Sequence, residues 1–375
     1  TQNSASHPRY VSEAAQSADM KPAVYQICAG FSRGDAISSE ALFIEKRLRK
    51  LNFKTAIFAE QFPESAAGMV NFFRHMPDRR DQILIYHHSF HSSALQFVLR
   101  ARARRKVLIF HNVTPPEYVE PYSQSLAERL ALARSELHGN AQAFEKVMAD
   151  SYFNAADLTG LGFRNVEVMP VIMDFPALDS HGKRRPRYFL EGGLNILFVG
   201  RIFPNKRHQD IIKTFYYLKK IHKNSRLILV GPFHPGERNY AGELFNLAAE
   251  LGLKRDVIFT GMIDQSELNL CYDHADLFFS MSEHEGFFVP LIECMYKRLP
   301  VLAFGSSVIP ETLGRSGVIF YEKDYARLAE MILLLARKPD LKGAVLAAQE
   351  TRLKDFDPER ALPLLERVWS ESLAG

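Results

Sequence analysis

Short apolar runs alternate with amphipathic segments along most of the chain. Runs that are apolar on both faces, separated by helices with one apolar face, are typical of a parallel sheet covered on both sides. The pattern predicts strands at residues 23–28, 54–59, 82–86, 107–110, 166–170, 194–199, 226–230, 257–260, 277–280, 301–304 and 317–321. We therefore expect an α/β protein.

Helices are predicted between these strands, and two of them have recognisable starts. Ser151 and Asp264 are expected to cap helices at 154–161 and 265–273, because a short polar side chain accepts hydrogen bonds from free N–H groups there. Further helices are predicted at residues 36–51, 68–75, 92–103, 126–147, 209–222, 240–251, 290–297, 325–337, 341–354 and 359–373.

The length of the chain favours two domains. A chain of 375 residues exceeds the size at which one hydrophobic core usually keeps growing. A polar stretch with several proline and glycine residues, 179–193, is expected to link a first domain at 22–178 to a second at 194–358. Residues 1–21 lack long apolar runs and are expected to form a flexible tail.

Composition and charge narrow the class of protein. Hydrophobic residues make up 47% and charged residues 24%, as in soluble globular proteins, and no apolar run approaches the ~20 residues that cross a bilayer. A formal charge of +4 is too small and too dispersed to favour nucleic acid as a partner. The three cysteines match no metal-site spacing and are typical of reduced thiols in a cytoplasmic protein.

The segment around Pro290 carries the strongest chemical signal. Proline suits the start of a helix, so a helix is expected at 290–297, and its free N–H groups favour a bound phosphate. Glu285 in the preceding loop and Glu293 in the first turn would accept hydrogen bonds from hydroxyl groups on either side of that phosphate. A nucleotide joined to a sugar has this chemistry. A glutamate near a helix start is also favoured by the dipole alone, so the spacing by itself is a weak signal.

Three motifs in the second half form a family resemblance. Glu285 and Glu293, with seven residues between them, resemble the E-x7-E signature of the retaining glycosyltransferase family 4. Gly200-Arg201 and Lys206 resemble its Gly-Arg-x4-Lys segment, and 257–261 resembles the strand and turn before its nucleotide site. The resemblance implies the GT-B architecture, in which two Rossmann-like doubly wound domains face a cleft. It also implies that the terminal helix at 359–375 packs back on the first domain.

The resemblance implies a role for each matched residue. Arg201 and Lys206 would bind the donor diphosphate, since a guanidinium fork and a mobile ammonium both suit phosphate oxygens. Glu285 would bind sugar hydroxyls and Glu293 the ribose diol. The backbone groups of Met262 and Ile263 would bind the base of the nucleotide. The remaining donor-site positions are Gly286, Phe287 and Phe288. Phe288 stands where the family usually has glycine, which puts the identity of the sugar in doubt.

The first half contributes candidates for the other side of the cleft. Gly30 and Asp35 lie in a loop after the first strand, and in the resembled family this loop faces the donor phosphates and the acceptor. The loop does not have the sequence G-x-G-x-x-G, so a classical dinucleotide-binding fold is not supported. His111 begins His-Asn-Val-Thr-Pro, which resembles a family segment whose histidine contacts the donor sugar. Tyr118 to Tyr122 would border the acceptor pocket.

Two clusters in the first half have competing interpretations. His87, His88 and His91 lack a neighbouring carboxylate or cysteine in sequence, which favours a loop lining the cleft over a metal site. The basic residues 100–106 are explained by the dipole of the helix that they end. Contact with an anionic membrane surface stays open as the alternative.

The predicted function is a retaining, metal-independent glycosyltransferase. It would move a hexose-type sugar from a UDP- or GDP-linked donor to a glycan or lipid-linked acceptor in bacterial-type polysaccharide or glycoconjugate synthesis. No cofactor, metal or nucleic acid is expected, and the protein is expected in the cytoplasm, with peripheral contact at the inner face of the cell membrane left open. The alternatives are a sugar-nucleotide epimerase of the same architecture and a catalytically silent relative that binds nucleotide sugar.

Overall fold

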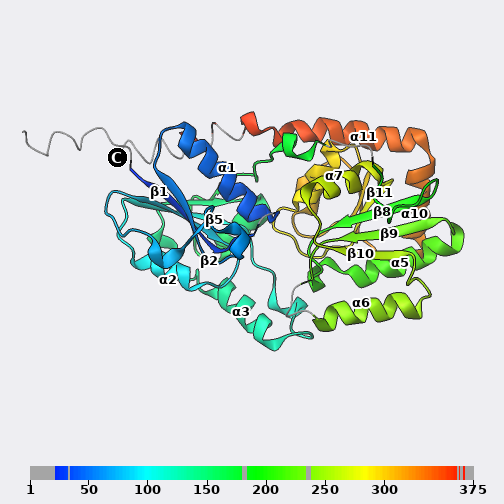
Figure 1. Cartoon of the computed structure of the whole chain (residues 1–375), viewed down its shortest axis with the longest axis horizontal. Helices are drawn as coiled ribbons and strands as arrows, with labels where there is room; N and C mark the ends of the chain where they lie inside the picture. Colours follow the sequence, from blue (N-terminus) through cyan, green and yellow to red (C-terminus); the bar gives the residue numbers. More distant parts are fainter. Residues whose placement is uncertain are drawn as a thin grey trace, which may run out of the picture.

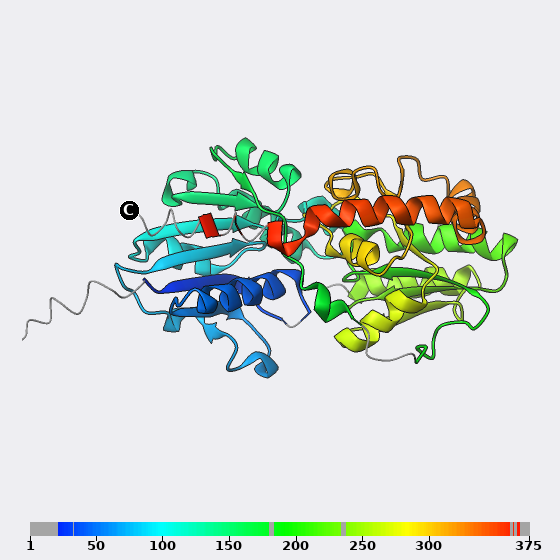
Figure 2. The same cartoon turned by 90° about the horizontal axis from the view of Figure 1, so that it is seen from above.

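The computed structural model describes residues 22–32, 34–179, 184–233 and 238–360, together with residues 363, 366 and 367. Two parallel sheets lie one after the other along the long axis, and each is covered by helices (Figures 1 and 2). The expected fold class, an α/β protein with two Rossmann-like doubly wound domains, is thereby confirmed.

The first sheet has seven strands in the order β3-β2-β1-β4-β5-β6-β7. They are β1 (Val24–Gly30), β2 (Thr55–Gln61), β3 (Asn71–Phe72), β4 (Ile83–His88), β5 (Arg105–Phe110), β6 (Lys146–Ala149) and β7 (Glu167–Val168). From β1 the successive strands β2 and β3 are added towards one edge of the sheet, and from β4 the strands β5, β6 and β7 are added towards the other edge. In such sheets ligands bind outside the carboxyl ends of the strands at the point of reversal, here between β1 and β4.

The second sheet has six strands in the order β10-β9-β8-β11-β12-β13. They are β8 (Leu194–Val199), β9 (Ser225–Val230), β10 (Val257–Gly261), β11 (Leu277–Ser280), β12 (Val301–Phe304) and β13 (Val318–Phe320). Its point of reversal lies between β8 and β11. The segments that follow these two strands carry Arg201, Lys206 and Glu285, so the topology brings the predicted donor residues to one place.

The helices form largely where the apolar periodicity places them. They are α1 (Ala36–Lys50), α2 (Ser93–Arg100), α3 (Gln124–Ser135), α4 (Tyr152–Gly160), α5 (His208–Ile221), α6 (Arg238–Glu250), α7 (Gln265–His274), α8 (Val289–Tyr296), α9 (Ile309–Leu313), α10 (Tyr325–Arg337) and α11 (Pro339–Leu353). Ser151 caps α4 by accepting a hydrogen bond from the Asn154 N–H at 3.1 Å. Asp264 caps α7 in the same way through the Glu267 N–H at 2.8 Å.

Several predicted elements are wrong. Residues 68–75 hold the short strand β3 and a 3-10 turn instead of a helix, because 71–72 pair with β2 and leave Phe73 to enter the core. The helix predicted at 126–147 ends at Ser135, and Gly139 beyond it has a φ of 78° that a right-handed helix does not allow.

Two segments that follow the first domain in sequence return to contact it. Phe203, from the loop after β8, is buried among the apolar residues of the first domain. Glu366 forms an ion pair with Arg47 on α1, so the segment after α11 reaches the first domain. Most of the predicted helix at 359–373 lies outside the described residues, as do the predicted tail and residues 180–183 of the predicted linker.

Gln349 on α11 stabilises the start of β12 through two hydrogen bonds to the backbone there. Its fully buried side chain accepts a hydrogen bond from the Val301 N–H at 3.1 Å and donates one to the Leu299 carbonyl at 2.9 Å. Each of these backbone groups would otherwise be buried without a partner, which is costly.

We expect Gln349→Leu to lower the free energy of unfolding by about 2 kcal/mol, because the apolar side chain satisfies neither backbone group. The neighbouring Glu350→Gln is the matched control, since the Glu350 carboxylate is 63% exposed and its one partner among the described residues is the exposed Arg298. Urea denaturation of both variants checks this. Equal stability in the two variants would contradict the role given to Gln349.

Candidate functional site

The carboxyl ends of the two sheets meet at Gly286. The Ser151 hydroxyl of the first domain donates a hydrogen bond to the Gly286 carbonyl at 3.0 Å. A Cβ atom at Gly286 would lie 2.5 Å from the His111 carbonyl oxygen and 3.0 Å from the Asn112 Cβ. Only glycine permits this approach, so the segment that carries Glu285 lies directly against the strand end that carries His111.

Three glycines lie side by side at the ends of β8, β9 and β10. The Gly231 N–H donates to the Gly261 carbonyl at 3.2 Å, and a Cβ at Gly231 would lie 2.0 Å from the Gly200 carbonyl oxygen. Beyond them the Met262 side chain is 67% exposed, so a ligand held here would meet mainly backbone groups. An open groove of about 640 Å³ adjoins this edge, lined by Arg184, Arg185, Arg187, Tyr188, Ile258, Phe259, Thr260, Ile263 and Glu267.

Lys206 and Glu285 form an ion pair at the reversal point of the second sheet. Glu285 is only 6% exposed, and its Oε1 atom has no hydrogen-bond partner among the described residues. Its backbone N–H donates to the Ser307 hydroxyl at 2.9 Å, which fixes the position of the residue. One carboxylate oxygen is therefore balanced by a cation and the other can accept from a ligand hydroxyl.

Backbone contacts hold the loop around Glu285 in place. The Asn205 side chain donates to the His284 carbonyl at 2.6 Å, and the Glu283 N–H donates to the Asn205 carbonyl at 2.8 Å. The Thr312 hydroxyl donates to the Phe287 carbonyl at 3.0 Å. The two halves of the Lys206–Glu285 pair thus lie on segments that are bonded to each other.

Phe288 precedes α8 in a left-handed conformation with a φ of 65°. This explains why glycine suits the position, since a side chain there costs roughly 1–2 kcal/mol. Its ring packs in the second-domain core, 6.4 Å from Phe198 and 6.0 Å from Phe278 between centroids, and Lys206 Nζ lies 5.2 Å from the ring centroid. The ring lies beneath Lys206, and Phe288 is only 6% exposed.

Glu293 lies in the second turn of α8, because the helix begins at Val289; the expectation of the first turn was wrong. The hydroxyl of the buried Tyr272 donates a hydrogen bond to its Oε2 atom. Burial raises the pKa of Glu293, and this hydrogen bond partly opposes the rise. The carboxylate is half-buried and is oriented by a rigid phenol.

Arg201 is exposed at the domain junction. Its guanidinium carbon lies 4.1 Å from the ring centroid of Phe203, whose own ring is inserted into the first domain. Stacking of this kind stabilises a guanidinium without using its N–H groups. Among the described residues Arg201 has no acidic partner, so its donors are available to an anion.

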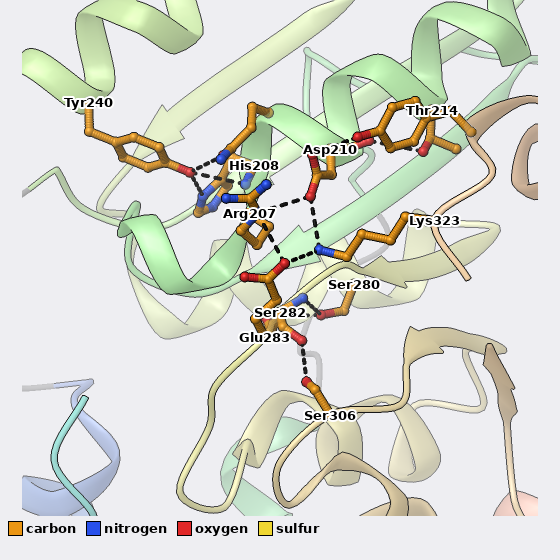
Figure 3. A network of polar contacts seen from close by, with 12 residues as sticks. Arg207, His208, Asp210, Thr214, Tyr240, Ser280, Ser282, Glu283, Ser306 and Lys323 are labelled. Atoms are coloured by element: carbon orange, nitrogen blue, oxygen red, sulfur yellow. Dashed lines mark hydrogen bonds and ion pairs between the residues drawn. The ribbon is translucent and has the colours of Figure 1, made fainter. Parts of the chain in front are cut away.

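A charged network around Asp210 was not predicted from the sequence (Figure 3). Asp210 accepts hydrogen bonds from Arg207 at 3.0 Å, Lys323 at 2.9 Å and Tyr325 at 3.0 Å, and Glu283 pairs with both cations. Burial would raise the pKa of Asp210, but the hydrogen bonds from Lys323 and Arg207 lower it below its usual value. Asp210 and Lys323 are 113 positions apart, which hides this pairing in the sequence.

His111 lies within a buried chain of hydrogen bonds and has a partner on each side. Its Nδ1 lies 2.9 Å from Asp150 Oδ2, and its Nε2 lies 2.9 Å from His87 Nδ1. Glu40 Oε2 is 3.7 Å from His111 Nδ1. Ligand atoms of Glu40, His87 and His111 lie within 4.8 Å of one another, as a metal site requires, but the two rings hydrogen-bond to each other, so we do not treat them as ligands.

The loop expected for the histidine cluster is wrong for His87 and His88, and of the three residues only His91 lies in a loop. His87 and His88 are the last residues of β4 and are fully buried, because β4 extends beyond the predicted end at 86. His88 Nε2 bonds to the Ala133 carbonyl at 2.9 Å, and His91 bonds to Glu136 at 2.8 Å. The sequence shows no carboxylate next to the histidines, but the fold brings the Glu40 carboxylate close to His87.

The remaining candidates have simpler surroundings. Gly30 ends β1 with space for a Cβ, since the nearest atom would be the Gln61 carbonyl oxygen at 3.7 Å. Asp35 caps α1 through the Ser38 N–H at 3.0 Å. Across the junction the rings of Tyr118 and Tyr122 lie 6.3 Å from His284 and 5.0 Å from Tyr240 respectively.

The basic residues 100–106 lie away from the junction. They precede or begin β5, whereas His111 follows its other end. Arg102 pairs with Asp78 at 2.9 Å, and Lys106 Nζ donates to the Leu99 carbonyl at 2.8 Å. Within the part of the chain that the structure describes, we find no helix with the length and apolar character needed to cross a membrane.

Part of the chain matches a known protein family and several curated proteins. Residues 183–348 match the family model described as glycosyl transferases group 1. The chain is 28% identical over 160 residues to the alpha-monoglucosyldiacylglycerol synthase of Streptococcus pneumoniae, covering 42% of this chain and 35% of that one. It is 23% identical over 275 residues to the O-antigen chain mannosyltransferase B of Escherichia coli, covering 70% and 69%. The matched parts therefore range from about one third to just over two thirds of these relatives.

Solved structures match along nearly the whole chain. Anabaena Alr3699/HepE in complex with UDP and glucose has a TM-score of 0.72 at 17% identity, covering 93% of this chain and 100% of that one. WaaG, a glycosyltransferase involved in lipopolysaccharide biosynthesis, has a TM-score of 0.67 at 14% identity, covering 90% and 98%. The chain thus has the GT-B fold of these structures, and its segment 183–348, which carries Lys206, Glu285 and Glu293, matches the group 1 glycosyl transferases.

Proposed function

We propose that this protein is a glycosyltransferase that moves a hexose-type sugar from a UDP- or GDP-linked donor to a glycan or lipid-linked acceptor. The observation that carries the proposal is the Lys206–Glu285 ion pair at the reversal point of the second sheet. This pair lies within the segment that matches the family model, and the carboxylate keeps one unpartnered oxygen.

The relatives support the choice of chemistry. The names of the two curated relatives describe transfer of glucose to a lipid and of mannose to an O-antigen chain. The HepE structure was solved with UDP and glucose. A donor of a nucleoside diphosphate and a hexose is consistent with the cations, backbone groups and carboxylates at the domain junction.

In the proposed mechanism, fixed cations stabilise the departing diphosphate. Among the residues that the structure describes, Arg201 has no acidic partner and Lys206 pairs with one carboxylate, that of Glu285. An arriving diphosphate competes with Glu285 for Lys206, which frees the carboxylate to accept hydrogen bonds from sugar hydroxyls. Preorganised charge of this kind lowers the barrier to leaving-group departure and fits the proposed reaction, which retains configuration and needs no metal.

Glu293 and the glycine-lined edge complete the proposed donor site. Tyr272 orients the Glu293 carboxylate, which would accept hydrogen bonds from the ribose diol. The backbone of Met262 and Ile263 would bind the base, since the Met262 side chain is directed to solvent. The loop between β11 and α8, which carries Glu285, is here called the donor loop. Gly286 allows this loop to contact the first domain, on which the acceptor would bind.

The function itself is tested by product analysis. The protein is incubated with UDP-glucose, UDP-N-acetylglucosamine or GDP-mannose and with a bacterial lipid extract, and free nucleotide and new glycoside are measured. We expect nucleotide release that depends on acceptor and a product that keeps the anomeric configuration of the donor. Isomerisation of the donor without transfer, or binding without turnover, would overturn the proposal.

Arg201→Ala is expected to lower turnover by roughly ten- to a thousandfold, by analogy with loss of one donor that stabilises developing negative charge. The matched control is Arg255→Ala, because Arg255 is also exposed but precedes β10, at the end of the sheet away from the junction. Steady-state rates with donor in excess provide the measurement. If both variants retain the rate of the unaltered protein, Arg201 has no part in leaving-group departure.

Glu293 is expected to discriminate ribose from deoxyribose. At 100 times its dissociation constant, the preferred nucleotide, UDP or GDP, should add about 2.7 kcal/mol to the stability. The unaltered protein should bind this nucleotide roughly tenfold more tightly than its 2′-deoxy form, since a hydrogen bond to a charged group contributes about 1.5–3 kcal/mol.

In Glu293→Gln this preference should shrink, with little effect on binding of the 2′-deoxy form. Thermal-shift titrations with the four protein–ligand pairs give the comparison. An undiminished preference in Glu293→Gln would show that another group reads the ribose.

A further inference from the structure

A cluster of five buried polar side chains lies beneath the domain junction. Gln26, Glu40, His87, His111 and Asp150 are each at most 9% exposed. Gln26 and His87 come from β1 and β4 at the reversal point of the first sheet, and the others come from α1 and from the ends of β5 and β6. Buried polar groups must be paired, so the positions of the protons are strongly constrained.

The hydrogen-bond directions start from Gln26. Its Nε2 donates to the Ala41 carbonyl at 2.8 Å, which fixes the amide orientation and turns Oε1 towards His87 Nε2 at 3.0 Å. An amide oxygen can only accept, so His87 Nε2 carries a proton. Burial lowers the pKa of His87 well below its usual value, so the ring is neutral and its Nδ1 is an acceptor.

His111 must therefore donate at both ring nitrogens. Its Nε2 faces the accepting Nδ1 of His87 at 2.9 Å, and its Nδ1 faces the Asp150 carboxylate at 2.9 Å. A carboxyl group is ordinarily more acidic than an imidazolium, so the shared proton lies on His111. Burial alone would lower the pKa of His111, but the Asp150 charge and hydrogen bond outweigh it and raise this pKa to about 9.

Glu40 completes the charge balance. Both of its carboxyl oxygens are buried without a hydrogen-bond partner among the described residues. Burial and the nearby Asp150 charge raise the pKa of Glu40 to about 8, although His111 opposes the shift. At neutral pH the cluster thus holds a neutral acid, one imidazolium and one carboxylate, and its net charge is zero.

We propose that Asp150, His87 and Gln26 are positioning residues that keep His111 doubly protonated, so that its ring is a fixed cation and not a general base. Within the proposed transfer reaction, on which this inference rests, His111 then takes no proton from the acceptor. Its carbonyl oxygen faces the Gly286 backbone, because a Cβ there would lie 2.5 Å away. The imidazolium holds this strand end rigid beneath the donor loop.

The proposal is tested by the protonation state of His111 in the full-length protein, which does not depend on activity. Long-range nitrogen–proton NMR of protein labelled with ¹⁵N-histidine should show both His111 nitrogens protonated at pH 7, with titration well above pH 7. His88 is the internal control, since its Nε2 bonds to a carbonyl and burial lowers its pKa to about 4. A bare His111 nitrogen at pH 7 would overturn the proposal even if no variant folds.

The Asp150→Asn variant tests the cause. Without the carboxylate His111 should lose its second proton near neutral pH, and its signals should move towards those of a neutral ring. Glu40→Gln should leave His111 doubly protonated, because the Asp150 charge and hydrogen bond raise the pKa of His111 more than Glu40 does. An unchanged His111 in Asp150→Asn would show that Asp150 does not hold the proton.

Stability should also depend on pH through this cluster. The pKa values of His111 and Glu40 in the folded protein, about 9 and about 8, lie above their ordinary values of 6.5 and 4.5. The folded state therefore binds protons more tightly, and its stabilisation is lost as pH rises through these folded values. We expect the melting temperature to fall between pH 7 and pH 9 and to fall less in Glu40→Gln. Other titratable groups that interact with His111 are Asp35, His87, His88 and Asp150.

A kinetic comparison separates this inference from the proposed function. In Asp150→Asn we expect the thermal shift with UDP or GDP to persist, the donor KM to stay within about twofold and kcat to fall roughly tenfold or more, as for loss of a preorganised charge. A protein that binds no nucleotide contradicts the proposed function and leaves the NMR result standing. A pH–rate profile that retains a limb from His111 acting as a base would overturn the positioning role.

Discussion

The contact between Gly286 and the His111 carbonyl is the constraint on which the geometry of the site depends. It sets how closely the two sheets approach, because any side chain at this position would separate them. A second contact holds the same junction: Glu311 accepts hydrogen bonds from the Tyr152 and Phe153 N–H groups at 2.8 and 3.0 Å. A carboxylate of one domain thus satisfies the helix start of the other, where N–H groups and the dipole favour negative charge.

The donor side combines strained backbone with strong local bonding. Phe288 and Arg207 both have left-handed φ values, 65° and 54°, that bulky residues seldom adopt. Such strain persists only where the surroundings over-determine it. The ring of Phe288 is held in an aromatic core, and the guanidinium of Arg207 is held by Asp210 and Glu283. The Lys206 ammonium lies 5.2 Å from the Phe288 ring centroid, and Arg207 follows Lys206 in sequence, so both strained residues help to fix the position of this ammonium group.

Sequence analysis predicted the features that are encoded locally. The caps at Ser151 and Asp264 and the start of α8 near Pro290 depend on a few adjacent residues, and the structure has all three. The buried cluster was not predictable, because His87, His111 and Asp150 are brought together only by the strand order of the sheet. From the sequence, His87 and His88 were expected in a loop lining the cleft. The fold instead places both at the end of β4 and turns the two rings to different partners.

Charge is balanced differently on the two sides of the junction. In the first domain the charges of the buried Asp150 and His111 balance each other in one ion pair. On the second, Arg207 and Lys323 are matched by Asp210 and Glu283, and Lys206 by Glu285. Among these described cations of the second domain, Arg201 is the one without an acidic partner. An incoming diphosphate would therefore gain most at Arg201 and would compete with Glu285 for Lys206. In the proposed reaction, binding of the phosphate and release of the carboxylate for the sugar would then be a single step, since one ammonium group cannot fully pair with both.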